Sequence, residues 1–291
     1  MSLHPKCEQF IKERQYLLNV SPSTLEWYRQ SLSWLETEEP TEDLLKCMVY
    51  KMRDGGLRAS SVNCRARAIN AYLHWNSGNK FPKCGPGCQH PRVPKLKTEQ
   101  RVLPTFSIED IAKFSKWKPK RHTQHRLKAI ILFLSDVGCR INEALSLEWK
   151  DVDFDNMLVT LHGKGAKDRT VPFSFELRRY LWKWKQQTEW EIVFPSRNGQ
   201  KLGRRDVLRD VKDLCEVLSI KVPERTLHAF RHTFALHYLR NGGSVFHLQK
   251  SLGHSSLEMS RRYSNLQTSD LQQIHQRVSL LSSTLAPRRS A

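Results

Sequence analysis

Long apolar runs are absent from the 291-residue chain, and no stretch approaches the roughly 20 consecutive apolar residues that a helix needs to span a bilayer. Residues 1–6 also lack the apolar region of a secretory signal peptide. The seven cysteines are odd in number and scattered, which indicates reduced thiols in a cytosolic compartment rather than a disulfide framework. The sequence therefore predicts neither a membrane protein nor a secreted one.

Acidic residues are also scarce, because 29 Asp and Glu residues face 48 Lys and Arg residues. The formal net charge is +19 and the pI is about 9.8. Residues 1–100 hold 15 basic and 10 acidic side chains, whereas residues 101–291 hold 33 and 19, so most of the surplus lies in the second part. A surplus of this size favours a polyanionic partner over a generally basic surface without one, with nucleic acid first and an anionic membrane second.

Internal repeats and low-complexity tracts are absent too. The hydrophobic content of 39% supports folded cores, and the chain is long enough for two domains. Helical apolar spacing fills the first part of the chain: a capping-box pattern at 23–26 begins one helix, Thr41 caps a second, and Ser60 and Ser61 begin a third. Residues 1–80 are therefore predicted to form a small helical domain.

Residues 81–104 interrupt this pattern, since five prolines and two glycines forbid a regular element there. We interpret the stretch as a basic linker between two domains. It contains Cys84-x-x-x-Cys88-x-His90, which has the residue types and the tight spacing of zinc ligands but no clear fourth ligand nearby. Cysteines in a flexible linker are the favoured interpretation, and no metal ligand is assigned.

The remainder of the chain combines helical patterns with one β-hairpin. A long apolar helix ends at Gly138, a residue that favours a helix C-terminus, and Arg140 opens the next helical stretch. Strand-like runs at 157–162 and 168–173 flank a turn that carries Lys164. Further helical patterns cover 176–188, 204–218, 227–240 and about 269–285. The predicted fold class is mainly α with a small β-sheet.

Several side chains of this second part suit chemistry on a phosphodiester. His228 and Arg231 are three residues apart and share a helix face, where an imidazole and a guanidinium fork fit two phosphate oxygens. Glu143, three residues after Arg140, is placed to hold that guanidinium. Tyr263 carries a phenol, whose ordinary pKa near 10 means that it needs a base or a positive field to act as a nucleophile. Each signal is weak alone, because surface ion pairs and structural tyrosines are common.

Taken together, this set resembles that of the tyrosine recombinase, or phage integrase, family of the simple two-domain type. The matching residues are, in chain order, Arg140 after a helix, Lys164 in the hairpin turn, His228-x-x-Arg231, Leu252-Gly253-His254, and Tyr263 nine residues after that histidine. Residues 163–172 also resemble the hairpin segment of the family. The match covers residues 101 to about 283, and the helical N-terminal part resembles the core-binding domain of the family more loosely.

The resemblance implies a SAM-like helical core-binding domain in residues 1–80 and a mixed α/β catalytic domain in residues 105–291, which form a C-shaped clamp on DNA. It implies a site-specific DNA recombinase that breaks and rejoins strands through a 3′-phosphotyrosyl intermediate, without divalent metal, ATP or another cofactor. The helix at about 269–285 is expected to be exchanged between the subunits of a tetramer. Double-stranded DNA with inverted-repeat core sites is the expected partner, at the nucleoid in the cytoplasm of a prokaryotic cell.

The resemblance also implies a role for each matching side chain. In that scheme Tyr263 is the nucleophile, Arg140 and Arg231 hold the phosphate oxygens, His228 and His254 assist proton transfer, Lys164 protonates the leaving oxygen, and Glu143 orients Arg140. Other basic side chains are expected to contact DNA: Arg58, Arg65, Arg67, Lys95, Lys97, Lys167 and Arg169.

Two other functions stay open on the sequence alone. A DNA-binding regulator with an inactive site would keep the basic surface but would not need the complete residue set. A type IB topoisomerase would use similar residues to relax DNA without exchanging partners, although the small helical domain and the hairpin segment favour recombination. No additional N-terminal arm-binding domain is recognised, which favours a simple recombinase. The target site, the accessory factors and the biological task are not specified.

Overall fold

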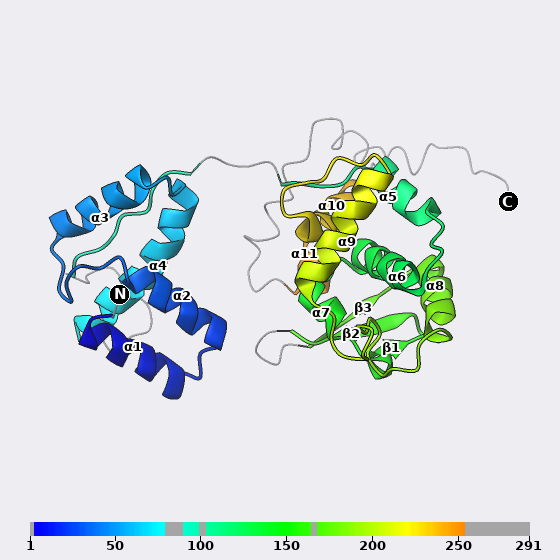
Figure 1. Cartoon of the computed structure of the whole chain (residues 1–291), viewed down its shortest axis with the longest axis horizontal. Helices are drawn as coiled ribbons and strands as arrows, with labels where there is room; N and C mark the ends of the chain where they lie inside the picture. The colour runs from blue at the N-terminus through cyan, green and yellow to red at the C-terminus, as the bar shows by residue number, and fades with distance from the viewer. Residues whose placement is uncertain (1–2, 79–89, 99–102, 164–167, 254–291) are drawn as a thin grey trace, which may run out of the picture. The chain divides into compact units, whose positions relative to one another are not determined.

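The computed structural model describes residues 3–78, 90–98, 103–163 and 168–253, and the chain divides into two compact units, Met1–Arg101 and Val102–Ala291 (Figure 1). Helices dominate both units, and a three-stranded antiparallel sheet lies in the second. The predicted fold class, mainly α with a small β-sheet, is confirmed. In the described part of the chain, no helix combines the length and the apolar character needed to cross a membrane.

The helices of the first unit pack around an aromatic core. They are α1 (Pro5–Tyr16), α2 (Pro22–Leu32), α3 (Glu42–Asp54) and α4 (Ala59–Asn76). The ring of Phe10 is fully buried and meets the rings of Tyr28 and Tyr72 edge-on, at centroid distances of 5.0 and 5.7 Å. Edge-on aromatic contacts of this kind add to the stabilisation that apolar burial provides.

Helix α2 begins earlier than the sequence pattern predicts. Its N-cap is Ser21, so the capping-box pattern at 23–26 lies inside the first turn rather than in front of it. Pro22 explains the shift, because its fixed φ suits the first helical position and its missing N–H has no partner to lose there.

A segment without regular secondary structure runs along α4 and is held by two asparagines of that helix. Asn63 and the main chain of Leu96 exchange two hydrogen bonds of 2.8 Å each. Asn70 makes the same reciprocal pair with Val93, at 3.0 and 2.8 Å. Val93 and Leu96 also pack against the core of the first unit. This packed stretch lies within residues 81–104, the range that the sequence predicts as a linker.

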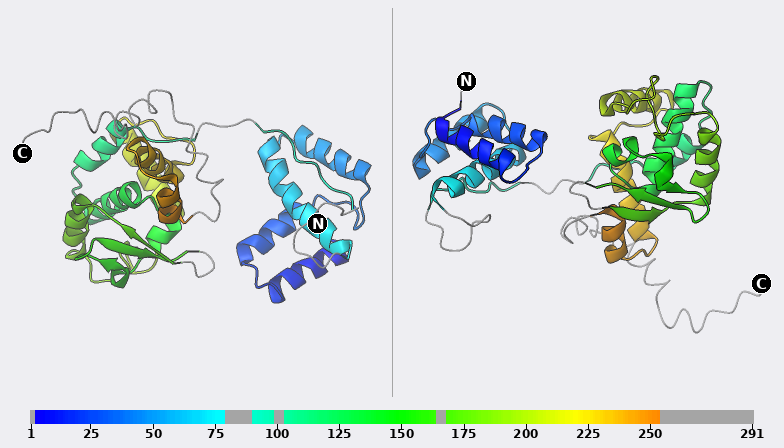
Figure 2. Two further views of the ribbon diagram at one scale, coloured as in Figure 1. Left: turned by 180° about the vertical axis from the view of Figure 1, so that it is seen from behind. Right: turned by 90° about the horizontal axis from the view of Figure 1, so that it is seen from below.

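The second unit is built around the buried helix α6. Its elements are α5 (Ile108–Lys116), α6 (His122–Val137), α7 (Ile141–Leu145), the 3-10 helix η1 (Trp149–Asp151), β1 (Val152–Asp153), β2 (Leu158–Leu161), β3 (Arg169–Pro172), α8 (Phe175–Lys185), α9 (Arg204–Val217), α10 (Thr226–Arg240) and α11 (Val245–Leu252). The strand order is β1-β2-β3, and Val159 pairs with Val171 in the predicted hairpin. The sheet forms one end of the unit, and α6, α10 and α11 lie beyond it (Figures 1 and 2).

Candidate active site

The site begins where α6 ends. Gly138 ends this helix in the left-handed region, with φ +65°, as the sequence predicts for a C-terminal glycine. A Cβ at this position would lie 2.2 Å from Cδ1 of Phe234, so both the backbone conformation and the space favour glycine. The sharp end of α6 brings Arg140 to the N-cap of α7.

Glu143 holds Arg140 through two hydrogen bonds. The backbone N–H of Arg140 donates to Oε2 at 2.8 Å, and Nη1 of its guanidinium donates to Oε1 at 2.9 Å. The Glu143 side chain is 6% exposed, whereas that of Arg140 is 39% exposed. The contact predicted from their spacing of three residues is therefore present, with the carboxylate inside and part of the guanidinium at the surface.

Arg169, from β3, also donates hydrogen bonds to the same carboxylate. Its Nη1 and Nη2 donate to Oε1 and Oε2 of Glu143 at 3.0 and 2.8 Å, and its Nε donates to the carbonyl oxygen of Ser251 at 2.8 Å. The side chain is only 10% exposed. The expectation that Arg169 is one of the DNA-facing cations needs correction, because all three guanidinium nitrogens donate to acceptors inside the unit.

Glu143 is ionised because its partners outweigh its burial. Burial raises the pKa of the carboxyl, but hydrogen bonds and charge from Arg169, together with hydrogen bonds from Arg140, hold it at about 2. A buried carboxylate with a guanidinium on each side is a fixed arrangement, since removal of any member leaves an uncompensated charge or an unsatisfied acceptor.

Arg231 lies on α10 and is also buried, with 5% exposure. Its Nη1 donates to the carbonyl oxygen of Gly138 at 3.0 Å, and its Nη2 donates to that of Leu252 at 2.7 Å. It therefore joins the end of α6 to the end of α11. Leu252 is two residues before His254, so Arg231 and Arg169 both attach the segment that leads to that histidine.

His228 is half-buried on the same helix. Burial lowers the pKa of its imidazole, and the guanidinium groups of Arg204, Arg231, Arg225 and Arg140 lower it further. Both effects favour the neutral form of the ring, which lies within an electropositive region. Arg225 lies three residues before His228, whereas Arg204 belongs to this region through the fold alone.

Three residues predicted for catalysis lie outside the described residues: Lys164, His254 and Tyr263. The same is true of the predicted DNA contact Lys167, the proposed exchange helix at about 269–285, and Cys84 and Cys88 of the metal pattern.

The predicted DNA-facing side chains of the first unit divide into two kinds. Arg65 packs on the protein, since its Nη1 donates to the carbonyl oxygen of Gln30 at 3.0 Å and its guanidinium lies over the ring of Trp34 at 5.8 Å. The others have exposed side chains: Arg58, Arg67, Lys95 and Lys97.

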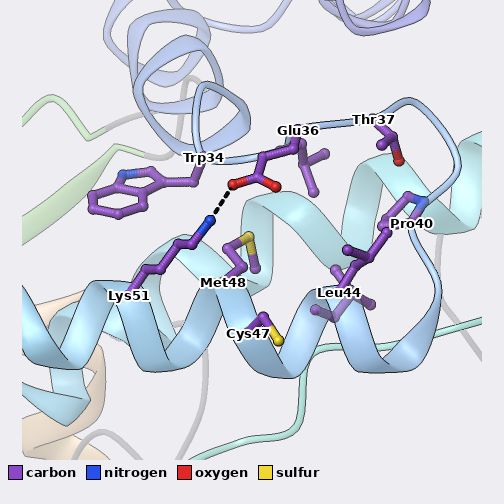
Figure 3. A pocket seen from close by; sticks show the side chains of 10 residues that line it. Trp34, Glu36, Thr37, Pro40, Leu44, Cys47, Met48 and Lys51 are labelled. Atoms are coloured by element: carbon purple, nitrogen blue, oxygen red, sulfur yellow. Dashed lines mark hydrogen bonds and ion pairs between the residues drawn. The ribbon is translucent and has the colours of Figure 1, made fainter.

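The first unit also has a small pocket between α3 and the preceding loop, which Figure 3 shows. An ion pair between Lys51 and Glu36, 2.5 Å long, lies among its otherwise largely apolar lining, which includes Trp34 and Met48. The charges of Lys51 and Glu36 are therefore paired with each other inside this lining. Within the described ranges, no group of three or more His, Cys, Asp or Glu side chains is placed to hold a metal ion.

Comparison with known proteins is consistent with this arrangement. Residues 101–270 match the phage integrase family. The chain is 30% identical to the tyrosine recombinase XerA of Pyrococcus furiosus over 271 residues, with 90% of each chain covered. It is 28% identical to the tyrosine recombinase XerD of Chlorobaculum tepidum over 281 residues, with 90% of this chain and 91% of the relative covered.

Solved structures share the fold at lower identity. One is the XerH site-specific recombinase bound to a palindromic difH substrate in a post-cleavage complex, with a TM-score of 0.72, 20% identity, and coverage of 94% of this chain and 83% of that one. Another is the Tn1549 transposon integrase in complex with transposon right end DNA, with a TM-score of 0.73, 20% identity, and coverage of 94% and 99%.

The fold and the site define the class of protein as a tyrosine recombinase, an enzyme of site-specific DNA recombination. The chain belongs to the phage integrase family, whose match spans more than half of its length.

Proposed function

We propose that Tyr263 is the nucleophile of this recombinase. Attack of its phenol oxygen on the scissile phosphate joins the 3′-phosphate to the tyrosine and releases the 5′-hydroxyl. Attack by the 5′-hydroxyl of another strand restores a phosphodiester and releases the phenol, so the number of ester bonds is unchanged and no energy source is needed. The observation that carries the proposal is the match of residues 101–270 to the phage integrase family, within which Tyr263 lies nine residues after His254. The buried Glu143 carboxylate supports it by holding Arg140 in place.

In this proposal, the cations of the second unit stabilise the negative charge that develops on the phosphate during the reaction. Arg140 and Arg231 hold the non-bridging oxygens, where negative charge grows in the transition state. A guanidinium has five N–H groups, and the bonds of Arg231 to the carbonyls of Gly138 and Leu252 use two of them. Burial and the nearby guanidinium groups favour the neutral form of His228, which is able to accept a proton or to donate a hydrogen bond from its N–H group. His254 assists it, and Lys164 protonates the leaving 5′-oxygen.

Arg169 is a positioning residue in this scheme, because it acts through other groups rather than on the phosphate. It fixes Glu143, which in turn fixes Arg140. It also holds the carbonyl of Ser251, three residues before His254. One guanidinium therefore couples the position of a phosphate-binding arginine to the position of the segment that leads to a histidine and to the nucleophile.

A nicked suicide substrate tests the role of Tyr263. The substrate carries the DNA segment that the protein protects most strongly, and the reaction contains no divalent metal. We expect a covalent protein–DNA adduct on a denaturing gel, its loss in Tyr263→Phe, and its retention in Tyr50→Phe, a control at an exposed tyrosine. No adduct from the wild type, as for a regulator, or an adduct that persists in Tyr263→Phe would overturn the proposal. Joining to a second, labelled strand distinguishes recombination from relaxation by a topoisomerase.

Arg169→Lys tests the positioning role. Lysine keeps the charge but loses the planar fork, so single-turnover cleavage is expected to fall on the order of 100-fold, the scale of a small misplacement of reacting groups. DNA affinity should change little. Arg209→Lys, at an exposed ion-paired arginine, is the control and should cleave normally.

A double-mutant cycle separates positioning from simple destabilisation. If Arg169 acts through Glu143, the pair Arg169→Lys and Glu143→Gln loses little more activity than either single variant. The positioning role would be contradicted if the losses of activity in the two single variants added up in the double variant. It would also be contradicted if the cleavage rate per folded molecule equalled that of the wild type.

For the assembly, we propose that the first unit and the second together clamp DNA with inverted-repeat core sites. The exposed Arg58, Arg67, Lys95 and Lys97, and Lys167, would contact the phosphate backbone, which is consistent with the net charge of +19. The helix predicted at about 269–285 would join subunits into a tetramer at the nucleoid in the cytoplasm. Truncation before residue 269 should leave binding to a half-site but abolish the tetramer, which the mass of the protein–DNA complex measures.

A further inference from the structure

Three side chains meet in an ion-paired cluster beside the β2–β3 hairpin. Nε2 of His162 lies 3.1 Å from Oδ1 of Asp151, and Nδ1 of the same ring lies 3.0 Å from Oδ2 of Asp168. His162 follows the last residue of β2, Asp168 precedes the first residue of β3, and Asp151 is the last residue of η1. One imidazole therefore joins three segments of the second unit, and we call this cluster the His162 clasp.

The two contacts of the ring require a particular protonation state. Aspartate is ordinarily ionised at neutral pH, and an ionised carboxylate only accepts hydrogen bonds. A neutral imidazole has one N–H group and donates to one carboxylate, whereas an imidazolium has two and donates to both. The hydrogen bonds to Asp151 and Asp168 accordingly raise the pKa of His162 above its ordinary value.

Asp151 is the fixed end of the clasp. Its side chain is 8% exposed, and its other carboxylate oxygen accepts the backbone N–H of Glu148 at 3.1 Å. The neighbouring cation of η1, Lys150, pairs with the side chain of Glu148. Asp168 is 52% exposed by contrast, so the imidazolium attaches a residue at the surface to an anchor inside the unit.

The clasp lies next to Arg169 in the sheet. Leu161 pairs with Arg169 in the β2–β3 ladder, and His162 and Asp168 are the next residue on each side of the hairpin. Their side-chain contact therefore extends the pairing by one position beyond Arg169. Because Arg169 donates two hydrogen bonds to Glu143, a displacement of the start of β3 would disturb this contact.

We propose that His162, as an imidazolium, is a positioning residue that fixes the start of β3 and makes the placement of Arg169 sensitive to pH. The inference rests on the positioning role proposed above for Arg169. The clasp is complete below the ordinary imidazole pKa of about 6.5 and is lost as pH rises through the higher value of the folded protein. The His162 side chain is 49% exposed, so solvent screens the pairs, and loss of the clasp should slow cleavage about two- to fivefold.

The pH dependence of single-turnover cleavage tests the proposal in the full-length protein, on the nicked substrate at saturating DNA. Wild type should cleave faster than His162→Gln at about pH 6, and the two rates should converge as the wild-type ring loses its proton. His162→Arg keeps a permanent charge and several donors, so it should retain the faster rate throughout. His237→Gln, at an exposed histidine of α10, is the control and should follow the wild type. A ratio of the wild-type rate to the His162→Gln rate that stays constant with pH would overturn the proposal.

The variant Arg169→Lys shows whether His162 acts through Arg169. With lysine at 169, addition of His162→Gln should no longer change the pH profile. A pH-dependent effect of the same size in this background would overturn action through Arg169.

An NMR titration of the His162 ring separates this inference from the proposed function, because it needs no DNA. The signal is assigned by its loss in His162→Gln, and a midpoint above about 6.5 is expected. A midpoint at or below that value would overturn the clasp even if cleavage depends on Tyr263. A raised midpoint in a protein that forms no covalent adduct would instead overturn the proposed function and leave the ion pairs in place.

Discussion

Basic side chains serve the two units of the molecule in opposite ways. In the second unit, Arg169 and Arg231 are buried, and each donates to named acceptors. In the first unit, Arg67, Lys95 and Lys97 are exposed. Burial of a cation is tolerated only where partners satisfy it, so the buried arginines are fixed before DNA arrives. Exposed cations instead release counterions when phosphate binds. We therefore expect buried cations to set the geometry of the reaction and exposed cations to set the affinity for DNA.

The largest effect is expected from Glu143→Ala, which leaves two guanidinium groups without their shared carboxylate. Removal of one partner from a buried ion pair costs about 3–5 kcal/mol, and urea unfolding of the variant should show a loss of that size. Glu39→Ala removes an exposed partner of Lys6 and should cost less than about 1 kcal/mol. Equal losses of unfolding free energy in the two variants would mean that the Glu143 carboxylate contributes no more than an exposed ion pair does.

Gly138→Ala should come next, because it strains the backbone and also meets a ring. Left-handed φ costs a non-glycine residue roughly 1–2 kcal/mol, and crowding against Phe234 adds about 1–3 kcal/mol. Gly242→Ala is the matched control, since φ there is +86° but no atom lies within 4 Å of the added Cβ. The difference between the two unfolding free energies isolates the contact with Phe234, and no difference would show that the ring moves freely.

A smaller effect concerns pH. The pKa of His228 is lowered in the free protein by burial and by four arginines, so this residue destabilises the fold as pH falls below about 6.5. Bound phosphate opposes the shift, and DNA binding should therefore take up a proton and tighten as pH falls through that range. The size of the gain is read from Kd measured across this pH range. His228→Gln should flatten this part of the titration; an unchanged slope would assign the proton to another group.

The smallest effect on folding is expected from Lys95→Ala and Lys97→Ala. Exposed positions of this kind change stability by less than about 0.5 kcal/mol. Each lost phosphate contact should reduce the slope of log K against log salt by about 0.9. Binding titrations at several salt concentrations measure this slope, and an unchanged slope would show that the residue does not contact a DNA phosphate.

Local contacts of the site were predictable from the sequence, because helix geometry brings residues three apart onto one face. Arg140 and Glu143 are such a pair, and Gly138 ends its helix as a C-terminal glycine should. The hairpin followed from alternating residues around a glycine-rich turn. The start of α2 lies before the capping pattern at 23–26, because Pro22 favours the first helical position.

Contacts between distant segments were not predictable in this way. Arg169 reaches Glu143 across 26 residues, and Arg231 reaches the carbonyl of Gly138 across 93. A basic residue beside a lysine-rich turn is typical of a DNA contact, and only the packing of β3 against α7 and α11 turns Arg169 inward. The contact between Nδ1 of His74 and Nε2 of His90, 3.3 Å long and sixteen residues apart in the chain, is a further example.

The single-turnover cleavage rate at saturating DNA tests most directly whether buried cations set geometry and exposed cations set affinity. It should be compared in Arg169→Lys and Lys97→Ala on the same nicked substrate. We predict a fall on the order of 100-fold in Arg169→Lys with near-normal affinity, and a normal rate in Lys97→Ala with weakened binding. A normal cleavage rate in Arg169→Lys, or a slow one in Lys97→Ala once its DNA is saturating, would contradict that division.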